Sequence, residues 1–147
     1  MGYKRPESVL VVIYAQSTGR VLMLQRRDDP GFWQSVTGSL EEGEPPLHTA
    51  QREVLEETGI DIAGENLPLV DCRRCIEFEI FPHLRHRYAP GVTRNQEHWF
   101  CLALPAQREV VITEHHAYRW LAAPEAAALT KSWSNRQAIE EFVNYSV

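Results

Sequence analysis

Six glutamates and one arginine lie within the 23 residues from Gly38 to Ile60, in the stretch GSLEEGEPPLHTAQREVLEETGI. This local excess of acid accounts for the whole formal net charge of −5. Carboxylate oxygens are the ligands that Mg²⁺ prefers, and protein-bound Mg²⁺ is usually shared with substrate phosphates. We therefore expect a metal platform for a diphosphate. The alternative, a solvated acidic helix face, leaves the close spacing and the internal arginine unexplained.

A helix over residues 45–58 is expected to carry the acids. Pro45 and Pro46 suit a helix start, and Gly59 suits its end. At about 100° per residue, three glutamates fall within an arc of roughly 100°, beside an apolar face. The three acids are Glu53, Glu56 and Glu57, and the apolar face contains Leu47, Ala50 and Val54. The pattern predicts a helix that packs on one side and presents carboxylates on another.

Apolar and alternating runs predict the strands that surround this helix. A C-terminal helix is predicted from an apolar stripe and from a capping box in which Ser134 pairs with Gln137. The chain is thus expected to form one mixed α/β or α+β domain over residues 1–147. The strand candidates are 8–15, 21–26, 32–36, 67–81, which forms one or two strands, 99–104 and 116–121.

The acidic stretch matches the Nudix box, G-x5-E-x7-R-E-U-x-E-E-x-G-U, where U is a bulky apolar residue. Every defined position is filled, and nine fixed positions make a specific signal. The chain therefore resembles the Nudix hydrolases. The resemblance implies an α/β/α sandwich with a mixed sheet, a divalent metal on the box helix, and hydrolysis of a nucleoside diphosphate linked to another group. The matching residues are Gly38, Glu44, Arg52, Glu53, Val54, Glu56, Glu57, Gly59 and Ile60.

The resemblance also implies roles for the box residues. Glu53, Glu56 and Glu57 are expected to bind Mg²⁺, with Mn²⁺ as a substitute. One of them, or a carboxylate outside the box, would accept a proton from water. Arg52 would orient a glutamate, Glu44 would brace the loop before the helix, and Gly38 would let the backbone approach the metal.

Glu114 lies in VITEHHAY, between two predicted strands. In Nudix enzymes a carboxylate from such a loop often completes the metal set or acts as the base, and we expect this of Glu114. The neighbouring residues His115 and His116 are expected to belong to a loop or strand rather than to bind metal.

Beyond the box, most of the chain resembles a bacterial subgroup of the family that acts on dihydroneopterin triphosphate. The resemblance implies cleavage between the α- and β-phosphates, which yields the monophosphate and pyrophosphate. The residues expected to contact the substrate are Lys4, Arg26, Thr37, Phe78, Glu79, Ile80, Phe81 and Ser132.

Each of these residues also has a plainer interpretation. Lys4 and Arg26 can be ordinary surface cations. The cyclic guanidine edge of a pterin suits a carboxylate or backbone carbonyls, but Glu77 and Glu79 equally fit the exposed face of a strand. Ser132 is expected to be free for substrate because Ser134 suits the cap. The basic segment 82–95 is expected either to cover the phosphates or to pair with the box glutamates.

Three other functions compete with pterin triphosphate hydrolysis. The first is nucleoside triphosphate pyrophosphohydrolysis with a preference for dATP, and only the base pocket separates it from the pterin activity. The second, an RNA 5′-end pyrophosphohydrolase, is disfavoured by the sequence pI of about 5.7. The third, a non-catalytic Nudix module, is disfavoured because all box carboxylates are kept. We expect a cytoplasmic protein with a small-molecule partner, bound to neither nucleic acid nor membrane, in an oligomeric state that the sequence does not predict.

Overall fold

The structure is a computed structural model that describes residues 2–143. Seven strands, three α-helices and one 3₁₀ helix make up the described part of the chain. In chain order they are β1 (Glu7–Ala15), β2 (Val21–Arg26), β3 (Trp33–Gln34), β4 (Val36–Ser39), α1 (Pro46–Thr58), β5 (Leu69–Glu79), η1 (Pro82–Arg87), β6 (Arg94–Leu104), β7 (His115–Leu121), α2 (Ala123–Leu129) and α3 (Trp133–Phe142).

All seven strands belong to one sheet with the order β3-β2-β1-β6-β5, in which β4 also pairs with β1 and β7 with β2. The pair β1–β6 is parallel, and every other pair is antiparallel. The sheet is therefore mixed, as predicted. The central strand β1 has an almost continuous run of buried residues, which is typical of a strand covered on both faces.

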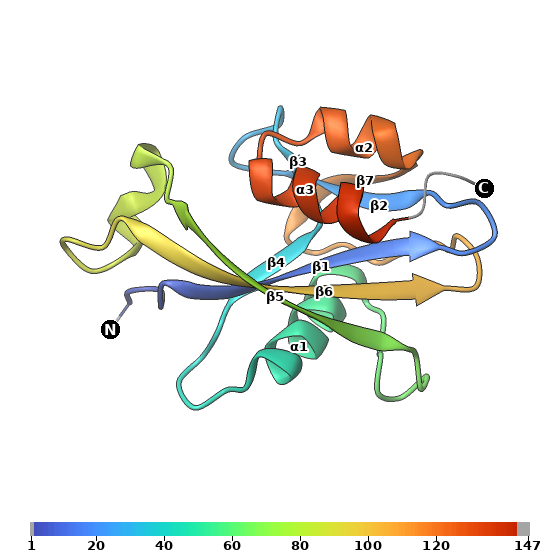
Figure 1. Cartoon of the computed structure of the whole chain (residues 1–147), viewed down its shortest axis with the longest axis horizontal. Coiled ribbons are helices and arrows are strands. Elements are labelled where there is room, and N and C mark those ends of the chain that lie inside the picture. The colour runs from blue at the N-terminus through green and yellow to red at the C-terminus, as the bar shows by residue number, and fades with distance from the viewer. Residues whose placement is uncertain (1, 144–147) are drawn as a thin grey trace.

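Helices cover both faces of the sheet: α1 lies on one side, and α2 and α3 lie on the other (Figure 1). Because side chains of a strand alternate between faces, β1 contributes to both layers. Val9 and Val11 pack in the cluster that includes Ala50 of α1. Leu10 packs in the second cluster, with Ile139 of α3. The predicted α/β/α sandwich is confirmed.

Helix α1 begins and ends almost as predicted. Pro45 is its N-cap residue, and Gly59 closes it in the left-handed conformation with φ 77°. The Gly59 N–H donates to Leu55 O at 2.9 Å. Glycine adopts a positive φ without steric cost, which explains why the helix stops there.

Several features of the fold differ from the prediction. The 3₁₀ helix η1 was not predicted, and the region of the predicted strand 32–36 forms two strands, β3 and β4. Helix α2 was not predicted, and β6 begins five residues before the expected start at Trp99. The capping box was placed wrongly: α3 is capped by Ser132, whose Oγ accepts from Asn135 N at 3.1 Å. Ser134 is instead buried in the first turn of the helix. No helix within residues 2–143 is long and apolar enough to span a membrane.

Candidate active site

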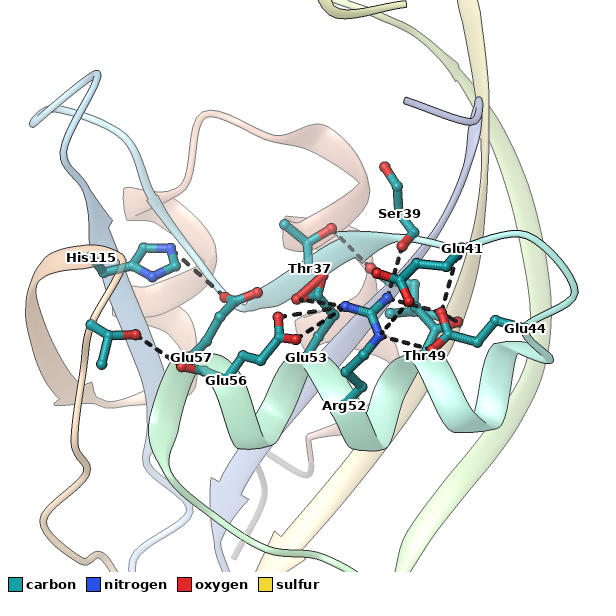
Figure 2. Close-up of polar contacts among 12 residues, drawn as sticks. Thr37, Ser39, Glu41, Glu44, Thr49, Arg52, Glu53, Glu56, Glu57 and His115 are labelled. Carbon is teal, nitrogen blue, oxygen red and sulfur yellow. Dashed lines mark hydrogen bonds and ion pairs between the residues drawn. The ribbon is translucent and has the colours of Figure 1, made fainter. Parts of the chain in front are cut away.

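The three glutamates of α1 lie in different environments. Glu53 and Glu57 are buried, with only 8% and 2% of their surface exposed, whereas 44% of the Glu56 side chain is exposed. Glu53 and Glu57 line one cleft together with Gly38 and Glu114. Helix periodicity brings residues i and i+4 to the same face, and in α1 this face is turned toward β4 (Figure 2). Glu56 lies outside the cleft, paired with Arg52.

Gly38 allows strand β4 to approach the buried glutamate. A Cβ atom at this position would lie 1.5 Å from Glu53 Oε2 and 2.1 Å from its Cδ. No side chain fits there unless Glu53 moves. The box glycine therefore has a steric role: it leaves room for a carboxylate between the strand and the helix.

Arg52 and Glu44 tie the loop before α1 to the helix (Figure 2). Arg52 donates to Glu44 through Nε and Nη2, both at 2.8 Å, and its Nη2 also donates to Ser39 O at 3.1 Å. Thr49 Oγ1 donates to the same carboxylate at 2.7 Å. The Arg52 guanidinium holds the pKa of Glu44 at about 2. Bidentate arginine–carboxylate pairs are geometrically specific, so this one fixes the loop geometry.

Burial leaves Glu57 with one unsatisfied oxygen. Glu57 Oε1 has no hydrogen-bond partner in the described part of the chain and lies 3.8 Å from His115 Nε2 (Figure 2). Burial also lowers the pKa of His115, so at neutral pH the imidazole does not supply a compensating charge. A buried carboxylate oxygen without a partner is costly, and this oxygen fits a ligand that the chain itself does not provide.

Both buried carboxylates are shifted toward the neutral form. Burial raises the pKa of Glu53 to about 8, and it raises the pKa of Glu57 well above its ordinary value. Repulsion among Glu53, Glu57 and Glu114 adds to the effect on Glu57. A cation in the cleft would favour the charged forms instead.

The donor set fits a hard divalent cation that is shared with a substrate. In residues 2–143 no three acidic, histidine or cysteine side chains are arranged around one point as a complete metal cage. Mg²⁺ commonly takes one or two carboxylates and completes its shell with water and substrate phosphates. Glu53 and Glu57 supply such a pair. Glu114 is exposed in the loop before β7 and lines the same cleft.

Three adjoining cavities form one continuous site, and Thr37 of β4 lines all of them. The first is the cleft around Glu53 and Glu57, here called the carboxylate cleft. The second, here called the cation groove, lies beside it and is lined by Lys4, Arg26 and Arg87. The third, here called the ring cavity, lies between α3 and the segment from β5 to η1. Thr37 Oγ1 donates to Val9 O at 2.8 Å, so its hydroxyl is free only to accept.

The cation groove gathers positive charge from distant parts of the sequence. Arg26 and Arg87 both pair with Asp28, at 2.6 Å and 3.0 Å. Burial and the two neighbouring arginines lower the pKa of Lys4, although the residue as a whole is exposed. Arg27 also lines the groove, where Asp28, Glu57 and Glu114 oppose the four cations. The groove therefore keeps only a small net positive charge, and its cations suit phosphate oxygens.

Local irregularity in β2 helps to place these groups. The register between β2 and β7 shifts between Gln25 and Arg26, where Arg26 lies opposite His115. Such bulges redirect side chains. Arg26 and His115 both line the cation groove. Of the basic segment 82–95, Arg87 faces this groove, and no arginine of the segment pairs with a box glutamate in residues 2–143.

The ring cavity is mainly apolar and aromatic. Ser132 lies at its wall, but its Oγ already accepts from Asn135 N, so the expectation of a free Ser132 hydroxyl was wrong. The cap requires an oxygen at the residue before the first turn, and Ser132 occupies that position. Glu79 lines the cavity, whereas Glu77 does not. The expected contacts Arg26, Thr37, Phe78, Glu79, Ile80, Phe81 and Ser132 all line it.

Sequence reasoning missed His115 and Glu97, and it included Arg87 only as part of the basic segment 82–95. His115 was expected to be an ordinary loop or strand residue, yet it lies beside Glu57. Glu97 is only 4% exposed and lines the ring cavity. Its spacing of two from buried Trp99 was an available signal, because alternate residues of a strand share a face.

Comparison with known proteins shows which class this fold and site define. A family model described as the NUDIX domain matches residues 4–142, and the chain belongs to that family. The chain is 74% identical over 141 residues to a dihydroneopterin triphosphate diphosphatase of Escherichia coli K12, covering 96% of this chain and 94% of the relative. A protein of the same name from Haemophilus influenzae is 50% identical over 143 residues, covering 97% and 90%.

A solved structure has the same fold. The structure of the E. coli dihydroneopterin triphosphate pyrophosphohydrolase superimposes with a TM-score of 0.95 at 73% identity, covering 97% of this chain and 98% of that one. The expectation of a Nudix hydrolase is confirmed. Nudix hydrolases generally use divalent metals, in agreement with the paired carboxylates of the cleft.

Proposed function

We propose that this protein hydrolyses dihydroneopterin triphosphate between its α- and β-phosphates, with Mg²⁺ as the metal and Mn²⁺ as a substitute. The products are dihydroneopterin monophosphate and pyrophosphate. One observation carries the proposal: a mainly apolar cavity for a flat ring joins a cation groove and a carboxylate cleft through a shared wall at Thr37. The names of two close relatives support the same substrate.

Different side chains of this site would bind the phosphates, the ring and the metal. Lys4, Arg26 and Arg87 bind phosphate oxygens in the cation groove, and the ring cavity holds the bicyclic ring. Glu53 and Glu57 hold the metal, with Glu114 from the facing loop. Glu56 joins them only if it leaves Arg52, with which it pairs at 3.4 Å. A divalent ion supplies charge neutralisation and lowers the pKa of water.

Hydrolysis also needs a group that accepts a proton from the attacking water. Candidates are the box glutamates and Glu114, which all lie at the cleft or beside it. Phosphoryl transfer needs little covalent chemistry from the protein, because positioning and charge stabilisation provide most of the rate. The site accordingly contains no serine or cysteine nucleophile in this scheme.

A single domain over 1–147, a cytoplasmic location and the absence of a nucleic-acid partner are proposed on the sequence alone. An RNA substrate would require contacts to a long phosphate backbone, and such binding weakens steeply with salt. Turnover of the pterin substrate should depend on salt less steeply, because a triphosphate contacts only the few cations of the groove.

Product analysis tests the proposed bond. We expect the purified protein with Mg²⁺ to release pyrophosphate from dihydroneopterin triphosphate, and inorganic phosphate only after a pyrophosphatase is added. Excess chelator should abolish release, and Mn²⁺ should restore it. Direct release of inorganic phosphate, or undiminished release in the presence of chelator, would contradict the proposal.

A further inference from the structure

Glu97 lies at the wall of the ring cavity on strand β6, and no assigned function uses it. Its residue surface is 4% exposed. The cavity has only one other acid, Glu79, which is exposed to solvent at the end of β5. Of the two acids, Glu97 is therefore the one that a desolvated ring in the cavity would contact.

The carboxylate of Glu97 is buried without a neutralising cation. Trp99 Nε1 donates to its Oε1 at 3.0 Å, and the nearby Ser134 hydroxyl partly opposes the rise in its pKa. No lysine, arginine or histidine of residues 2–143 forms an ion pair with it. Burial raises its pKa. A buried, unpaired acid is costly to keep, and a glutamine would satisfy both neighbours at lower cost.

Three other polar side chains of the cavity already have partners within the protein. Asn135 exchanges two hydrogen bonds with Ser35, at 2.7 Å and 2.9 Å. Ser132 caps α3, and Arg26 pairs with Asp28. A carboxylate has two oxygens with about four acceptor positions, so Glu97 retains acceptor capacity after Trp99 and Ser134 are satisfied.

We propose that Glu97 determines ring specificity by accepting two parallel hydrogen bonds from the cyclic guanidine edge of the pterin, its ring N–H and its 2-amino group. This inference rests on the proposed function and deepens it. Paired donors match the two oxygens of a carboxylate, as in arginine–carboxylate pairs. A ring that offers a carbonyl oxygen in place of the amino group would set an acceptor against the carboxylate, and a site of this kind rejects such analogues strongly.

The first test uses the variant Glu97→Gln, which keeps size and an acceptor for Trp99 but replaces one acceptor by a donor. We expect kcat/KM for dihydroneopterin triphosphate to fall about 10- to 100-fold, mainly because KM rises. This is the range expected for the loss of one bidentate contact. For dTTP, whose base lacks the amino-substituted edge, the change should stay within about threefold. Equal losses on both substrates would show a purely structural role and overturn the inference.

Glu77→Gln is the matched control. Glu77 lies on the neighbouring strand β5, its side chain is 51% exposed, and it lies outside the ring cavity. This variant should retain the wild-type values for both substrates. If its pterin selectivity falls as far as that of Glu97→Gln, the assignment to Glu97 is wrong.

A second test uses only the wild-type protein, so it does not depend on how the variant folds. Free pterin and lumazine, which carries oxygen in place of the 2-amino group, are compared as inhibitors of triphosphate hydrolysis. We expect the inhibitory concentration of pterin to be at least about tenfold lower than that of lumazine. Lumazine has no 2-amino group, so it would leave an acceptor of the site unpaired. Equal inhibition would overturn the inference. Failure of the wild type to hydrolyse dihydroneopterin triphosphate would instead overturn the proposed function.

Discussion

Glu57 shows how one residue can be unfavourable for folding and necessary for function. Its carboxylate is 2% exposed, one oxygen has no hydrogen-bond partner in the described residues, and Glu53 and Glu114 repel it. Folding alone gains nothing from this arrangement. We therefore expect Glu57 to lower the free energy of unfolding when no metal is bound, and a bound divalent ion to offset this loss.

The variant Glu57→Gln should separate these two effects. We expect turnover to fall at least about 100-fold, the loss typical of removing one electrostatic stabiliser. The melting temperature without metal should rise, because the amide carries no charge into the cleft. Steady-state kinetics and thermal melts in chelator provide the two measurements. Glu109→Gln, an exposed acid outside the three cavities, is the control and should behave as wild type.

The raised pKa values of Glu53 and Glu57 predict that the stability of the metal-free protein depends on pH. Folding raises the pKa of Glu57 above 4.5 and that of Glu53 to about 8, so the folded protein holds more protons across this range. Metal-free wild type should therefore lose stability as pH rises from about 5 to 8. Glu57→Gln should lose less. A wild-type melting temperature that rises over this interval in chelator would contradict the assignment.

At the scale of the elements, the contact between β4 and α1 decides the shape of the cleft. Gly38 in the strand faces Glu53 in the helix with no room for a Cβ. Its φ is not positive, so alanine fits the backbone there, and only the contact with Glu53 opposes it. The Arg52–Glu44 pair holds the adjoining loop in place.

Gly38→Ala should therefore displace the Glu53 side chain and leave the fold intact. We expect turnover to fall about 100-fold, as for a displacement of about 1 Å in a catalytic constellation. Circular dichroism should remain native-like. Gly31→Ala is the control, because its Cβ would meet the flexible end of Lys131, at 3.3 Å, and Asp29 Oδ1 at an ordinary contact distance of 3.7 Å. If Gly38→Ala kept full turnover, Glu53 would not need its observed position.

The sequence predicted those elements whose signals are local. Helix α1 carries its own start and stop at Pro46 and Gly59, and the box spacing identified the cleft. Glu97 was missed because its burial depends on β1 and α3, which are distant in sequence. The N-cap was misplaced because Ser132 and Ser134 suit it equally by type, and only the chain path before α3 distinguishes them.

Across the whole molecule, the sandwich brings remote segments into one site. The N-terminal segment supplies Lys4, β2 supplies Arg26, and η1 supplies Arg87. Their charges face the cation groove between the cleft on α1 and the ring cavity beside α3. No single element could provide this arrangement, because the ring cavity and the carboxylate cleft are built from helices on opposite faces of the sheet (Figure 1).

The most direct measurement compares kcat/KM, with Mg²⁺, for dihydroneopterin triphosphate, dATP and the other nucleoside triphosphates under identical conditions. All these substrates carry a triphosphate and differ in the ring and in the group that joins it to the phosphates, so the comparison tests the ring end of the site rather than the cleft and the cation groove. We predict pyrophosphate release from the pterin triphosphate at a kcat/KM at least about tenfold above that of dATP, whose adenine lacks the paired N–H and amino donors, which is the preference expected from one bidentate contact. Equal or better use of dATP would contradict the claim and indicate a hydrolase of nucleoside triphosphates.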